Sequence, residues 1–116
     1  MSSNTHVIRK EFNKLVRGRI PEIIAANGDI PHTRVMETEE YERALMEKIS
    51  EEARELGLAG TRGEIIEEAA DVFEVLEAML KAYEISDEEV KAAKDSKRVK
   101  RGGFDGKIML EYTEGK

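Results

Sequence analysis

The chain has 116 residues, of which 38% are charged and 5% aromatic, and its formal net charge at pH 7 is −6. This length predicts one domain, and the acidic balance disfavours binding to nucleic acid, which is itself a polyanion. Cysteine is absent, which excludes disulfides and thiol chemistry and fits a cytoplasmic location. We expect no membrane partner, because no apolar run approaches the roughly 20 residues of a membrane span and the first residues lack the apolar core of a signal peptide.

The first half of the chain carries signals for two helices. Residues 1–12 are polar and predict a loose N-terminal segment, with a single domain over residues 13–116. Pro21 suits a first helical turn and Asn27-Gly28 is a stop signal, which predicts a short helix ending at Ala26. Thr38 is the expected N-cap of a second helix, which reaches Leu56 and ends before Gly57.

Two capping boxes start the remaining helices. The first, Thr61-x-x-Glu64, predicts a long helix that continues to about residue 84. The second, Ser86-x-x-Glu89, predicts a helix to about residue 101, where two glycines end it.

Two further features shape the expected fold. Residues 107–112, KIMLEY, alternate in the manner of a strand and could pair with residues 33–36. The segment over residues 65–83 is apolar over about half of its circumference. A single layer of neighbouring helices would not cover so broad an apolar surface. We therefore expect a homo-oligomer, either a dimer or a tetramer. The predicted fold is mainly α, with about four helices forming an oligomeric antiparallel helical bundle and a small C-terminal β element.

Two pairs of acids stand three residues apart, Glu52 with Glu55 and Glu68 with Asp71. At about 100° per residue, Glu52 and Glu68 fall inside the apolar stripes of their helices, and their partners lie at the edges. Carboxylates are rarely buried unless they are paired or bound to metal, and two that lie about 6 Å apart repel by about 3 kcal/mol at an effective dielectric near 20. Four converging acids favour a hard divalent cation, Mg²⁺ or Mn²⁺. Because acids are 25 of the 116 residues, a solvated helix face is the alternative interpretation.

Two groups of basic residues could bind the phosphates of a substrate held at such a metal. A cation held by carboxylates commonly takes part in phosphate chemistry, with substrate phosphates completing its coordination. One group comprises Lys14, Arg17 and Arg19. The other lies on the last predicted helix and comprises Lys91, Lys94, Lys97, Arg98, Lys100 and Arg101, of which Lys97 and Arg101 are the favoured candidates. The alternative interpretations are a solvated loop for the first group and cations that complement the helix dipole for the second.

The acidic motif also resembles that of a known family. EExxE at residues 51–55, followed by ExxD at residues 68–71, resembles the signature of the all-α nucleoside triphosphate pyrophosphatases, the MazG-like superfamily. The flanking stretches NKLVRGRIPEII and KRGGFDGKIMLE resemble its phosphoribosyl-ATP pyrophosphohydrolase-like branch. The resemblance runs from about residue 13 to residue 111. The branch usually reads LVRDKIPE, and Gly18 here stands in place of the Asp, which leaves the role of that acid open.

This resemblance implies an enzyme that uses Mg²⁺ to hydrolyse the α–β phosphate linkage of a nucleotide, giving a nucleoside monophosphate and pyrophosphate. Clearing of non-standard nucleotides would fit that activity. The implied metal ligands are Glu52, Glu55, Glu68 and Asp71. One of the first two, Glu52 or Glu55, would also orient or deprotonate the attacking water. The residues implied to hold phosphate are Lys14, Arg17, Lys97 and Arg101. Two alternatives remain: phosphoribosyl-ATP hydrolysis in histidine biosynthesis, and a non-enzymatic oligomerisation or regulatory module whose buried acids are satisfied by Arg or Lys.

Overall fold

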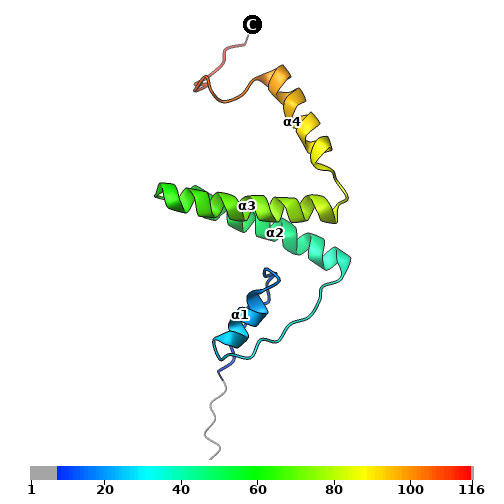
Figure 1. Cartoon of the computed structure of the whole chain (residues 1–116). Helices are drawn as coiled ribbons and strands as arrows, with labels where there is room; N and C mark the ends of the chain where they lie inside the picture. Colours follow the sequence, from blue (N-terminus) through cyan, green and yellow to red (C-terminus); the bar gives the residue numbers. More distant parts are fainter. Residues whose placement is uncertain (1–7, 116) are drawn as a thin grey trace, which may run out of the picture. The chain divides into compact units, whose positions relative to one another are not determined.

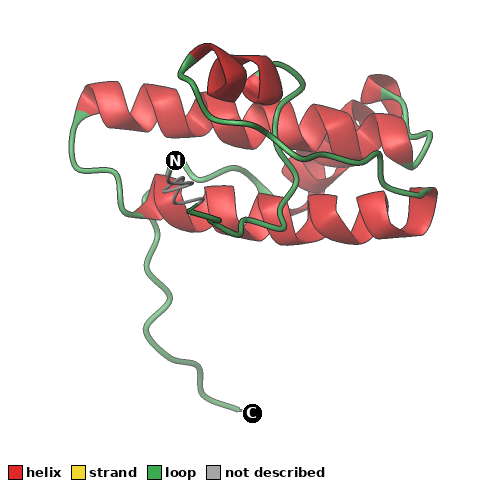
Figure 2. Ribbon diagram, turned by 90° about the horizontal axis from the view of Figure 1, so that it is seen from below, coloured by secondary structure: helices red, strands yellow, loops and turns green. Residues whose placement is uncertain are grey.

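The computed structural model describes residues 8–115, in which four α-helices are joined by loops (Figures 1 and 2). The chain divides into two compact units, the first ending at Met79 and the second beginning at Leu80. This confirms the predicted mainly α fold. Residues 1–7 of the expected loose segment lie outside the described residues, and residues 8–19 contain no helix.

The expected β element is wrong. Residues 33–36 and 107–112 are loops, and the described part of the chain contains no strand. The alternation in KIMLEY indicates a strand only if one face becomes buried, yet Ile108 and Leu110 are 90% and 75% exposed. A strand without a paired edge and a covered face has nothing to offset its loss of conformational entropy.

Helix α1 spans Ile20–Ala26, with Pro21 in its first turn as predicted. Helix α2 spans Thr38–Gly57, so that its bounds are each one residue wider than expected. Its N-cap is Glu37, whose carbonyl accepts the first helical hydrogen bond from the Tyr41 amide at 2.9 Å. Gly57 was expected to end the helix, but helical hydrogen bonding continues past it, because the Leu58 amide donates to the Arg54 carbonyl at 3.2 Å.

Helices α3 and α4 begin at the predicted capping boxes. Helix α3 spans Arg62–Ala82, and the Glu64 amide donates to Thr61 Oγ1 at 3.1 Å. It ends two residues early because Glu84 adopts a left-handed conformation with φ 56°. Helix α4 spans Asp87–Arg101, and both hydrogen bonds of the Ser86 capping box are present.

Helix α2 and the part of α3 up to Met79 form an antiparallel hairpin in the first unit (Figure 1). Among the described residues only Leu45 and Glu52 are buried, at 2% and 7% exposure. Large apolar side chains on α3 remain open to solvent, including Phe73 at 65% and Ile66 at 57%. The hairpin therefore leaves much of its apolar surface uncovered. Within residues 8–115, no helix is both long and apolar enough to cross a membrane.

Candidate metal centre

Three of the four predicted metal ligands come together on the α2–α3 hairpin. Helix α2 contributes Glu52 and Glu55, which lie on one face because they are three positions apart. Helix α3 contributes Glu68. One carboxylate oxygen from each of the three lies within 4.8 Å of the other two. Glu52 is buried, Glu68 is half-buried and Glu55 is exposed. The cluster is therefore anchored in the hairpin and open to solvent on the Glu55 side.

Glu52 is the most constrained carboxylate of the cluster. Burial raises its pKa, and the charge of Glu55 raises it further, while Lys48 opposes the shift. The Lys48 ammonium lies 3.5 Å from Glu52 Oε1, whereas the buried Oε2 atom makes no hydrogen bond. Since an unpartnered buried carboxylate oxygen is costly, this position is suited to a metal ion or a proton.

Glu68 resembles Glu52 in having a raised pKa and a buried oxygen without a hydrogen bond. Desolvation raises its pKa, followed by the charges of Glu55, Asp71 and Glu52. Its Oε2 atom is also buried and makes no hydrogen bond. An all-oxygen set of this kind matches the ligand preference of Mg²⁺ and Mn²⁺. The donor set thus fits the cation that the sequence predicts.

Asp71 does not join the three-acid group. Its Oδ1 atom accepts a hydrogen bond from Arg17 Nη2 at 2.7 Å. Asp71 follows Glu68 by one turn of α3, and its charge raises the pKa of both Glu52 and Glu68. The structure therefore pairs a predicted metal ligand with a predicted phosphate-binding residue. The Arg17 guanidinium is thus the hydrogen-bond partner of this carboxylate.

The remaining predicted phosphate ligands belong to other segments of the chain. Lys14 is exposed, and its ammonium lies 5.8 Å from the centre of the Phe12 ring. Lys97 and Arg101 are exposed on α4 in the second unit, so their role at the site stays a prediction. Sequence reasoning missed Lys48 as a partner of the acids. Its position four residues before Glu52 was a usable signal, because such pairs face each other on a helix.

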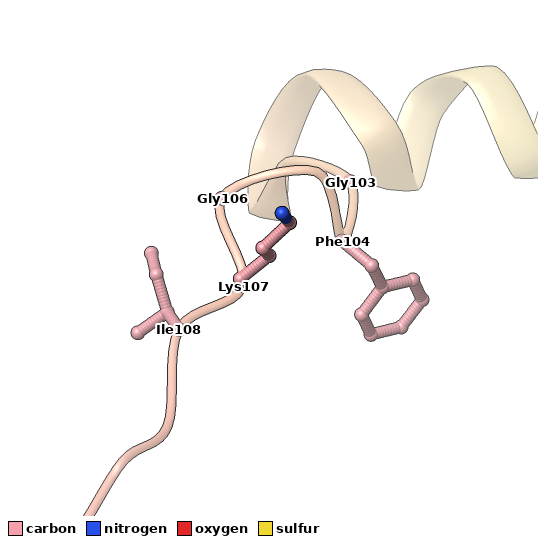
Figure 3. A pocket seen from close by; sticks show the side chains of 5 residues that line it. All are labelled: Gly103, Phe104, Gly106, Lys107 and Ile108. Carbon is pink, nitrogen blue, oxygen red and sulfur yellow. The ribbon is translucent and has the colours of Figure 1, made fainter.

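A shallow hollow of about 170 Å³ lies in the loop after α4. Figure 3 shows the Lys107 side chain inside this turn, with Phe104 and Ile108 pointing outward. Phe104 and Ile108 are 99% and 90% exposed, and no carboxylate lines the hollow. It therefore lacks the donor set and the enclosure of the acidic cluster and is the weaker candidate site.

Comparison with known proteins finds similarity over part of the chain. No family model matches the chain, and no solved structure matches it. A protein of Mycolicibacterium smegmatis described as an uncharacterized protein is 46% identical over 54 residues, which are 47% of this chain. The matched segment spans 55% of the length of that relative. A segment of this chain is therefore similar to part of another protein whose name specifies no activity.

Proposed function

We propose that this chain is a divalent-metal-dependent nucleotide pyrophosphohydrolase of the MazG-like type. It would cleave the α–β phosphate linkage of a nucleoside triphosphate to a monophosphate and pyrophosphate. The supporting observation is the convergence of Glu52, Glu55 and Glu68 from two helices to within 4.8 Å, with a buried, unpartnered oxygen on two of them. The motif that resembles the family is therefore also the cluster that fits a hard cation.

The three carboxylates have different roles in this proposal. Glu52 and Glu68 carry the unpartnered oxygens and would hold the cation. A bound Mg²⁺ lowers the pKa of a coordinated water and neutralises charge on the phosphates. Glu55 is the exposed member, and its carboxylate is the one best placed to orient an incoming water and accept its proton. The water oxygen bonds to one phosphorus of the linkage, and the bridging oxygen leaves with the other.

We further propose that the working form is a homo-oligomer in which a second copy covers the exposed face of α3. Phe73, Ile66 and Ile65 are 65%, 57% and 50% exposed in the single chain. Apolar patches of this kind on soluble proteins mark interaction sites. A second copy is the favoured occupant because the same three side chains would then meet their counterparts, as in a two-fold interface. A cytoplasmic location belongs to the same proposal and is supported by the absence of cysteine.

Two ion pairs favour a second candidate, a non-enzymatic helical module. Lys48 lies 3.5 Å from Glu52, and Arg17 lies 2.7 Å from Asp71. In a structural module these cations would be the permanent partners of the acids. The two candidates differ in whether divalent metal changes stability and whether pyrophosphate is released.

The test is a panel of nucleoside triphosphates, including oxidised and deaminated ones, assayed for pyrophosphate with Mg²⁺ and with Mn²⁺. We expect metal-dependent release, loss of that release in Glu55→Gln, and retention in Glu51→Gln. Glu51 is the matched control because it is an exposed neighbour outside the three-acid group. Absence of pyrophosphate release with either metal, together with no stabilisation by metal, would favour the structural module.

A further inference from the structure

The ion pair between Arg17 and Asp71 connects two parts of the first unit that are 54 positions apart in the sequence. Arg17 precedes α1, and Asp71 lies on α3, one helical turn after Glu68. The distance from Arg17 Nη2 to Asp71 Oδ1 is 2.7 Å. Asp71 therefore belongs to the electrostatic surroundings of the acidic cluster, while its carboxylate is held by a cation from outside the hairpin.

The ion pair between Arg17 and Asp71 can break easily. The side chains of Arg17 and Asp71 are 58% and 39% exposed, and ion pairs this open to water are weak. Arg17 lies in a segment without helix, and it is followed by Gly18, around which there is open space. The guanidinium can therefore leave the carboxylate without disturbing a packed element.

A divalent cation bound by Glu52, Glu55 and Glu68 would compete with Arg17 for the Asp71 carboxylate. Before binding, Arg17 supplies the positive charge nearest to this carboxylate. After binding, the cation places two positive charges beside it, in a site whose other ligands are already carboxylates. Cation and guanidinium then compete for the same oxygen atoms.

We propose that Arg17 holds Asp71 in the metal-free protein and is displaced when a divalent cation binds, so that Asp71 becomes the fourth ligand and Arg17 is freed beside the site. This inference rests on the proposed function, because the cation is the one that function requires. The freed guanidinium is a bidentate donor for phosphate oxygens. Metal and phosphate ligands would therefore bind cooperatively, because the first releases the group that holds the second.

A double-mutant cycle tests the exchange, with the affinity for Mn²⁺ alone measured by titration calorimetry in the absence of nucleotide. The variants are Arg17→Gln, Asp71→Asn and the double substitution. We expect Arg17→Gln to bind Mn²⁺ about threefold more tightly than the unaltered protein, the size of effect typical of an exposed ion pair. Asp71→Asn should bind more weakly, and adding Arg17→Gln to it should change nothing further.

Arg19→Gln is the matched control. It removes the same charge from the same segment, but Arg19 pairs with Glu22 at 2.6 Å rather than with Asp71. Its Mn²⁺ affinity should equal that of the unaltered protein. Circular dichroism confirms that each variant keeps its helical content.

Each of the following results would overturn the exchange. Equal tightening by Arg17→Gln and Arg19→Gln, or equal tightening with and without Asp71, would mean that Arg17 acts through its charge alone. Weaker binding in Arg17→Gln would mean that Arg17 braces Asp71 for the metal. If Mn²⁺ binds and Glu52→Gln removes it while the Arg17 variant has no effect, the exchange fails and the proposed function stands. If the unaltered protein binds no Mn²⁺, both fail.

Discussion

Replacing Glu52 by Gln should stabilise the metal-free protein and destabilise the metal-bound one. Glu52 is 7% exposed, the Lys48 ammonium lies 3.5 Å from it, and carboxylate oxygens of Glu55 and Glu68 lie within 4.8 Å of it. Gln keeps the shape and hydrogen-bonding capacity of the side chain but removes its charge. Lys48 can then turn outward, because its side chain is already 22% exposed.

The magnitude follows from the distances. At the upper limit of 4.8 Å and an effective dielectric near 20, each neighbouring carboxylate repels an ionised Glu52 by about 3.5 kcal/mol, whereas Lys48 at 3.5 Å attracts it by about 5 kcal/mol. The two repulsions exceed the attraction by about 2 kcal/mol. Because Glu55 is exposed and salt screens its charge, we expect about 1 kcal/mol of stabilisation. For a domain of this size that raises Tm by about 4 °C.

The pH dependence has a defined sign. The folded protein raises the pKa of Glu52 above 4.5, so that ionisation of this group costs folding free energy. The cost is absent below the ordinary carboxyl pKa and complete once the pH exceeds the raised value. The advantage of Glu52→Gln should therefore be close to zero near pH 4 and grow as the pH rises toward about 7. Glu40 and Glu89, whose pKa values are lowered, are present in both proteins and cancel in the difference.

Thermal unfolding followed by circular dichroism measures both effects, at fixed protein concentration because an oligomer makes Tm concentration-dependent. Glu51→Gln, the exposed neighbour, is the control and should change Tm little. Saturating Mg²⁺, at about 100 times its Kd, should stabilise the unaltered protein by about 2.7 kcal/mol and Glu52→Gln by much less, which reverses their order. If Glu52→Gln lowers Tm near neutral pH without metal, then Glu52 and Lys48 form a stabilising ion pair and the repulsion argument is refuted.

Three further predictions concern other parts of the chain. Glu68→Gln should abolish pyrophosphate release without loss of helical content, and full activity in this variant would remove Glu68 from the site. Phe73→Asp should shift the protein toward monomer in analytical ultracentrifugation, because a charge would replace a 65%-exposed ring at the proposed interface, and an unchanged mass would place the interface elsewhere. Ser86→Ala should destabilise α4 by about 1 kcal/mol through loss of its capping box, visible as faster amide exchange in the first turn of that helix, whereas exchange at the unaltered Thr61 cap should stay the same.

The sequence predicted the local features of this fold well. Helix starts at the Thr61 and Ser86 caps depend on residues three positions apart, and such contacts form within one turn of helix. The burial of Glu52 likewise followed from helical periodicity alone. Glu68 is only half-buried, although it lies inside the apolar arc of α3, because a single chain does not cover so broad an arc.

Features that depend on distant parts of the chain were harder to predict. The pairing of Arg17 with Asp71 joins residues 54 positions apart, and neither periodicity nor spacing carries information about such a contact. The expected strand at residues 107–112 failed for a related reason, since a strand requires a partner edge that its own sequence does not provide. The acidic cluster was predictable because its acids lie on two consecutive helices, α2 and α3. The short turn between these helices brings their acids together.

That short turn has a consequence for how the chain folds. Glu52 and Glu68 are only sixteen positions apart in the sequence, and a tight connection between α2 and α3 brings them together. Contacts between residues close in sequence have a low cost of loop closure, so we expect this hairpin to form early and to bring its acids together as it does. If the proposed metal binds these acids, we expect that it would also relieve their repulsion while the hairpin forms and would so aid folding.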